Sequence, residues 1–135
     1  MGIWGIGIFD NDDAMDFIGQ LLLAEDISSL RDALYKVIEP QSYIELPDCC
    51  IALAAIAVIA AMKDKDYSLL PDSAKRWAIN MNSSINARLI GLAQKAVLTI
   101  ATESELQNLW SKSDTYNDWT KLIGKLTERL NSIDL

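Results

Sequence analysis

Histidine is absent from the 135 residues of this chain, and its absence removes several common kinds of functional site. Histidine is the commonest general base of enzymes and the commonest protein ligand of transition metals. A structural zinc site normally needs four cysteines or histidines, and the chain has only two cysteines. A glycine-rich phosphate loop followed by lysine and serine or threonine is also missing. We therefore expect no enzyme activity, no cofactor and no metal.

Cysteine, glycine and proline are scarce. The two cysteines, Cys49 and Cys50, are adjacent, and a disulfide between neighbours is strained. Secreted proteins of this size usually have separated pairs, so we interpret both thiols as reduced and buried. Six glycines, three prolines and 50% hydrophobic residues are typical of a folded globular protein. Because no basic stretch followed by an apolar one opens the sequence, we expect no signal peptide and a cytoplasmic location.

The chain has no apolar run long enough for a typical membrane span. Its longest run, residues 49–62, has 14 residues and is rich in alanine. A transmembrane helix needs about 20 apolar residues. The run therefore predicts a buried core helix, and we expect no membrane association.

Apolar residues recur at helical spacing through most of the chain, and no sustained alternation typical of strands follows residue 9. We expect an all-α fold, with about six or seven helices in a single bundle-like domain over residues 1–135. Residues 1–9 hold three glycines and predict an irregular segment, with Trp4 and Phe9 in the core. The expected helices begin at Asp10 or Asn11 and end near 23, and then cover 27–39, 49–62 (after a cap at Asp48), 72–79, 83–101, 104–112 and 115–131.

Helix ends and inward positions follow from the same patterns. Asp48, Ser104 and Asp114 are in positions to cap the helices that follow them. Among the apolar positions expected to face the core are Leu22, on the first helix, and Leu109 and Trp110, on the sixth. The other three tryptophans, Trp4, Trp77 and Trp119, also lie within apolar patterns and are expected inside.

The negative charge is unevenly distributed. The net charge is −7, but residues 1–50 hold ten acids and two bases, whereas residues 51–135 hold nine acids and ten bases. All of the excess charge therefore lies in the first third of the chain. Phosphates would be repelled there, which argues against nucleic-acid binding, whereas a basic protein partner would be attracted.

The densest acidic cluster is Asp10, Asp12, Asp13 and Asp16. Carboxylates can bind Mg²⁺ or Ca²⁺, or act in pairs as acid and base. The spacing does not match an EF-hand, because the required glycine and glutamate are missing. The simpler interpretation is a capped helix start, since acids in a first turn favour the positive end of the helix dipole. A metal-binding or catalytic site at Asp10–Asp16 remains an alternative.

The opening sequence, MGIWGIGIFDNDDAMDF, resembles the start of an uncharacterised bacterial family of domains of unknown function. The resemblance covers about the first 25 residues. The matching positions are Met1, Gly2, Trp4, Gly5, Gly7, Phe9, Asn11, Asp12, Ala14, Asp16 and Phe17. Small acidic members of that family look like immunity proteins of contact-dependent growth inhibition and related toxin systems. The resemblance implies a cytoplasmic protein that binds and neutralises one cognate toxin.

Our hypothesis from the sequence is such an immunity protein, bound to a toxin with a basic surface, such as a nuclease. Tyr43, beside Glu45 in the 40–47 loop, could act as an aromatic anchor. The candidate contacts are Asp12, Asp13, Glu25, Asp26, Asp32, Glu39, Tyr43, Glu45 and Asp48. A non-catalytic adaptor domain unrelated to toxins is the alternative that the same features allow.

Overall fold

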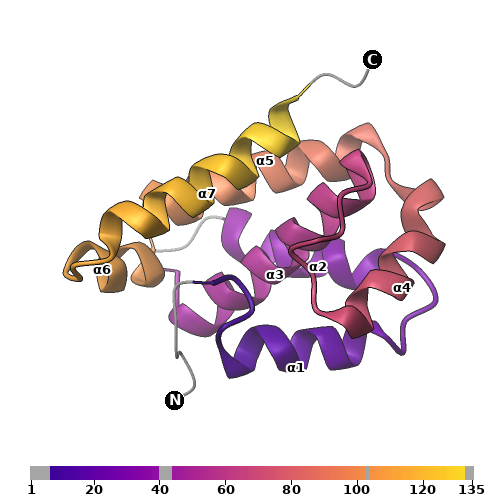
Figure 1. The fold of residues 1–135 in the computed structure, drawn as a ribbon, viewed down its shortest axis with the longest axis horizontal. Coiled ribbons are helices and arrows are strands. Elements are labelled where there is room, and N and C mark those ends of the chain that lie inside the picture. The colour runs from indigo at the N-terminus through magenta and orange to yellow at the C-terminus, as the bar shows by residue number, and fades with distance from the viewer. Residues whose placement is uncertain (1–6, 40–43, 103, 133–135) are drawn as a thin grey trace.

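The computed structural model describes residues 7–39, 44–102 and 104–132. These residues form seven α-helices, one short 3-10 helix and no strand, which confirms the predicted all-α fold (Figure 1). Of the segment expected to be irregular, residues 1–6 lie outside the described part of the chain, and Trp4 is one of them. The elements are α1 (Asp12–Leu21), α2 (Ser28–Ile38), α3 (Leu46–Asp64), α4 (Asp72–Met81), η1 (Asn82–Ser84), α5 (Ala87–Thr102), α6 (Glu105–Ser111) and α7 (Tyr116–Asn131).

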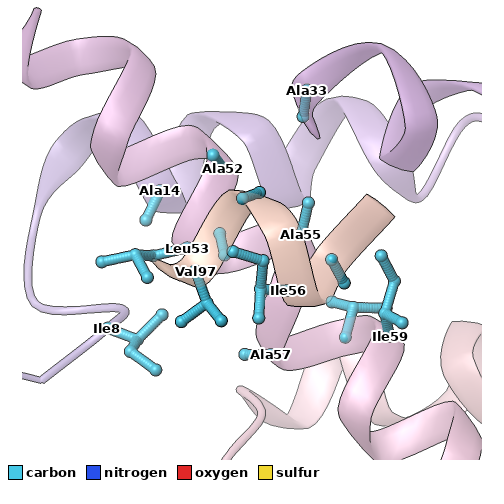
Figure 2. Close-up of a cluster of buried hydrophobic side chains, with 14 of the residues drawn as sticks. Ile8, Ala14, Ala33, Ala52, Leu53, Ala55, Ile56, Ala57, Ile59 and Val97 are labelled. Carbon is cyan, nitrogen blue, oxygen red and sulfur yellow. The ribbon is translucent and has the colours of Figure 1, made fainter. Parts of the chain in front are cut away.

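The helix α3 lies at the centre of the fold and contacts each of the other six α-helices. Fourteen of its residues are buried, on all sides of the helix. Figure 2 shows Leu53, Ile56 and Ile59 of α3 among apolar side chains, with Ala14 and Val97 from neighbouring helices. The many alanines of α3 leave little side-chain bulk, so that neighbouring helices can approach it closely.

The central helix is longer than the apolar run that predicted it. It begins three residues before that run and ends two residues after it, because Pro47 suits the first turn of a helix and Lys65 ends it in a left-handed conformation, with a φ of 60°. Its most apolar stretch of 18 consecutive residues has a mean hydropathy of 1.9, and by length and composition such a helix could span a membrane. In this fold, 78% of that window is buried inside the protein, as expected for a core helix.

The outer helices bury one face each. In α1 the buried residues are Ala14, Phe17, Ile18 and Leu21, at the spacing that the sequence predicts. Leu22 does not join them: it is 39% exposed, because α1 ends at Leu21 and the chain turns away.

Tryptophan burial follows the predictions only in part. Trp77 and Trp119 are buried as expected. In the short helix α6, only Leu106 is buried, whereas Trp110 is half-buried and Leu109 is 45% exposed, contrary to prediction. Leu106, Leu109 and Trp110 share one side of α6 by their spacing, but only the first turn of this short helix is buried in the core.

Two of the predicted caps are correct and two are not. Asn11 caps α1, because its Oδ1 accepts a hydrogen bond from the Ala14 amide at 2.7 Å, and Ser104 caps α6 in the same way. Asp48 lies inside α3 instead of before it, and α7 begins after Thr115 without a side-chain cap. The start of α3 is capped from a distant segment, since the carboxylate of Glu105 accepts a hydrogen bond from the Leu46 amide.

The arrangement places α1 and α7 on opposite sides of α3, and α4 and α6 at opposite ends of the molecule in Figure 1. An ion pair fastens the far end of α3 to α7: Nε of Arg129 donates to Asp64 at 2.7 Å and Nη2 donates to the same carboxylate at 2.9 Å. The indole of Trp77 donates to the carbonyl of Ala24 at 3.0 Å and so ties α4 to the loop after α1.

Candidate partner-binding surface

The predicted contact residues come from five places in the fold. Asp12 and Asp13 occupy the first turn of α1, Asp32 lies on α2, and the remaining acids lie at or between helix ends. Asp13 and Asp48 are half-buried, and the other acids are exposed. Tyr43, the predicted aromatic anchor, lies outside the described residues. The acids between or beside helix ends are Glu25, Asp26, Glu39, Glu45 and Asp48.

These acids do not form one patch. Asp13 lies close enough to the first turns of α3 for its charge to raise the pKa of Cys50, although burial of that thiol is the larger cause of its pKa of about 12. Asp48 likewise contributes to the raised pKa of Cys49, again after burial. By contrast, Glu25 and Asp26 follow the other end of α1, about 15 Å along the helix axis from Asp12 at 1.5 Å per residue. The structure therefore places Asp12 and Asp13 at one end of α1 and Glu25 and Asp26 beyond the other end, with Asp32 and Glu39 on or beside α2.

Some of the predicted contact acids have roles within the fold. Asp26 accepts hydrogen bonds from the amide of Ser28 at 3.0 Å and from its hydroxyl at 2.7 Å, and these bonds lower the pKa of Asp26 and hold the turn before α2. Asp32 lies 3.9 Å from the guanidinium of Arg31. Within the described part of the chain, the other acids have neither a hydrogen bond nor an ion pair through their carboxylates.

The surface of α1 that faces away from α3 combines acids with exposed apolar side chains. Asp12 and Asp16 are exposed and four residues apart, so they lie on the same side of the helix. Met15 is 37% exposed, and Leu22, seven residues further on, is 39% exposed. Leu23, just beyond the end of the helix, is 84% exposed. We call these five residues the α1 outer face.

No cation balances the α1 outer face along the chain, because residues 7–30 contain neither lysine nor arginine. The carboxylates of Asp12 and Asp16 have no hydrogen bond or ion pair within residues 7–39, 44–102 and 104–132. Sequence reasoning missed the apolar half of this surface. It placed Leu22 in the core and gave Met15 no role, because a pattern of apolar residues does not show where a helix ends.

The segment before α1 is held by its own polar side chains. The carboxylate of Asp10 accepts a hydrogen bond from the Gly7 amide at 3.1 Å, and the Asp10 amide donates to the Gly7 carbonyl at 3.0 Å. A Cβ atom at Gly7 would lie only 2.5 Å from that carboxylate, so a larger residue there would displace the Asp10 side chain from its hydrogen bond. Asn11 is buried and also donates through its side chain to the Ile8 carbonyl at 3.2 Å.

This geometry bears on the alternative of a metal or catalytic site at Asp10–Asp16. Asp10 and Asn11 are engaged in the turn and the helix cap, and Asp12 and Asp16 are on the exposed side of α1. Within the described residues, no three acidic or cysteine side chains come together in a group that could hold a metal ion. The carboxylates at 10–16 therefore do not converge on one position in the described structure.

The sequence profile of a family described as "Domain of unknown function (DUF4259)" matches residues 2–121. The chain belongs to this family. No curated protein and no solved structure matches the chain. The match extends far beyond the first 25 residues on which the resemblance rested, through every helix before α7 and into α7 itself. The DUF4259 domain thus comprises the central helix and nearly all of its cover, and the description of the family assigns it no activity.

The opening motif of this DUF4259 domain now divides into two sets of residues. Gly7, Asn11, Ala14 and Phe17 serve the turn, the cap or the core, and Phe9 packs partly buried against it. Asp16, in contrast, has no hydrogen bond or ion pair within the described structure, and Asp12 has only the general role of an acid in the first turn of α1. Among the described positions of the motif, the acid that folding does not explain is therefore Asp16, on the α1 outer face.

Proposed function

We propose that this DUF4259 domain is a non-catalytic cytoplasmic protein that binds a positively charged protein partner through the α1 outer face. We propose further that the partner is the toxin of a bacterial competition system, for which the domain is the immunity protein. The observation that supports binding there is the combination of unpaired Asp12 and Asp16 with exposed Met15, Leu22 and Leu23, in a segment without a cation.

The two kinds of side chain would have different tasks in binding. Exposed carboxylates attract a basic partner and align it, and this raises the association rate most strongly at low salt. Apolar side chains that become fully desolvated at the centre of an interface supply most of the affinity. The acids flank exposed apolar side chains on α1, so a partner with lysines and arginines around an apolar patch would complement both.

The proposal of a toxin partner has separate support. Many toxins of bacterial competition are nucleases, which hold phosphates in basic clefts. A domain with a net charge of −7, with all of its excess negative charge in its first third, can cover such a cleft. The N-terminal signature resembles that of small acidic immunity proteins, and the absence of histidine agrees with an inhibitor that acts by binding alone.

The test uses the protein encoded immediately upstream of this one as the probe. We expect the two purified proteins to form a complex in calorimetry, and expression of the domain to protect cells from the upstream protein. Neutralising two acids of the α1 outer face, with Asp12→Asn and Asp16→Asn together, should weaken the complex by about tenfold or more, mostly through slower association at low salt. Leu23→Ser should weaken it by faster dissociation.

Matched variants elsewhere separate a specific surface from a general charge effect. Asp72→Asn with Glu128→Gln removes the same charge from exposed positions on α4 and α7, and Leu98→Ser changes a leucine of α5 that is 64% exposed. These controls should leave affinity within about twofold. Equal losses in both sets would contradict the α1 outer face as the binding site. A complex without any protection of cells would contradict the immunity function but leave the binding surface supported.

A further inference from the structure

A cleft between α2 and the start of α5 differs in character from the rest of this acidic protein. It has a volume of about 330 Å³, and α2 packs directly on α5 beside it. Arg31 and Tyr35 line it from α2, and Arg88 lines it from α5. Ile27, Leu89 and Leu92 provide an apolar lining. No acidic residue of the described chain lines the cleft.

Most polar side chains of the cleft are available to bind a ligand. Arg88 and Tyr35 have no side-chain hydrogen bond or ion pair within the described residues. Arg31 forms an ion pair with Asp32 at 3.9 Å, and both side chains are at least half exposed, at 50% and 73%. After the hydrogen bonds from Ser28, the charge of Arg31 is also a smaller cause of the lowered pKa of Asp26, whose carboxylate is engaged with Ser28. An exposed pair at that distance contributes little, so it leaves the guanidinium available. Asn86 also lines the cleft, but its Oδ1 is engaged with the Leu89 amide at 2.9 Å.

Two guanidinium groups in one small cleft repel each other unless an anion lies between them. Guanidinium binds carboxylate and phosphate groups with two parallel hydrogen bonds, and it does so better than lysine. The apolar lining would receive the uncharged body of the same ligand. A volume of about 330 Å³ is at the lower end of the range for small-molecule sites, so the ligand must be small.

From these observations we propose that the cleft between α2 and α5 binds a small organic anion, with its carboxylate or phosphate between Arg31 and Arg88 and its apolar body against Leu89 and Leu92. This site is distinct from the α1 outer face. Its occupation does not depend on the proposed immunity function, and each proposal can fail without the other.

The experiment is a titration of the isotopically labelled protein, followed by the amide resonances of Tyr35, Arg88 and Leu89, at constant ionic strength. Phenyl phosphate and benzoate carry an anion on an apolar ring, and the stronger binder of the two identifies the preferred head group. Inorganic phosphate carries the anion alone, and benzamidine carries the ring with a positive charge. We expect saturable shifts with phenyl phosphate or benzoate at about millimolar concentration, binding of inorganic phosphate about tenfold weaker, and no binding of benzamidine.

Substitution of the arginines locates the site. Arg88→Gln should reduce the affinity for the preferred ligand by about tenfold, because it removes a bidentate contact while the exposed position tolerates the change. Arg76→Gln, at an exposed position on α4, removes the same charge away from the cleft and should have no effect. The proposal is wrong if no shift saturates, if benzamidine binds as well as the anions, or if both arginine variants lose affinity equally.

Discussion

The helices α1 and α3 are adjacent and in contact, yet packing explains them to different extents. In α3, 14 of 19 residues are buried, and nearly every side chain is accounted for by the neighbour it touches. In α1, four residues are buried, and the outer side carries exposed acids and apolar groups that the described residues leave partly or largely open to solvent. Exposed residues that folding does not require are the most informative about function. In α1 these residues form the α1 outer face.

The largest expected effect tests the α3 side of the comparison. Ile56→Ala should lower the free energy of unfolding by about 4 kcal/mol, because Ile56 is fully buried among neighbours on all sides and the cavity cannot close. Leu23→Ala, at the exposed end of α1, should change it by no more than about 0.5 kcal/mol. Urea denaturation measures both. A small loss for Ile56→Ala would mean that α3 is less tightly enclosed than described.

The next effect tests how the end of α3 is held. Burial would raise the pKa of Asp64, but the hydrogen bonds from Arg129 and from the Asp66 amide outweigh it, and the pKa is lowered. The side chains of Asp64 and Arg129 are 24% and 22% exposed. Asp64→Asn should therefore cost about 2 kcal/mol near neutral pH, as expected for charged hydrogen bonds that are mostly buried.

The pH dependence of that loss follows from the direction of the shift. A carboxylate with a lowered pKa in the folded state stabilises the protein above its ordinary value of 3.8, and this contribution disappears as the pH falls through the lowered pKa. The difference between wild type and Asp64→Asn, from urea denaturation, should thus shrink in acid. Asp72→Asn breaks the exposed pair with Lys75 and should cost no more than about 0.5 kcal/mol at any pH. If the two variants behave alike, the Arg129 contact does not hold α3 to α7.

Most of the fold could be predicted from the sequence because its signals are local. The helical spacing of Ala14, Phe17, Ile18 and Leu21 shows directly which side of α1 is buried. An apolar run without an obvious polar face, such as residues 49–62, has to be central. What could not be predicted depends on distant segments: Glu105, which caps α3 through the Leu46 amide, is 59 residues away in sequence.

The candidate surface was only partly predictable for the same reason. Net charge pointed to the first third of the chain, but it could not show that Asp26 is engaged with Ser28, or that Glu25 and Asp12 lie at opposite ends of α1. The exposure of Leu22 and Leu23 depends on where α1 ends. The spacing of apolar residues alone predicts that an apolar residue near a helix end is buried. The cleft of Arg31 and Arg88 joins two helices that are far apart in sequence, and no motif marks it.

The smallest expected effect compares two residues of α1 and its cap that both occur in the opening motif. Asn11→Ala should cost about 1 kcal/mol, because it removes the cap on the Ala14 amide and the bond to the Ile8 carbonyl from a buried site. Asp16→Ala should change stability by less than about 0.5 kcal/mol, and in the favourable direction, since it relieves repulsion from Asp12 and introduces the best helix former. Thermal or urea unfolding distinguishes the two. If Asp16→Ala proved as costly as Asn11→Ala, then Asp16 would belong to the folding part of the motif, and the argument that α1 keeps its outer acids for a partner would lose its basis.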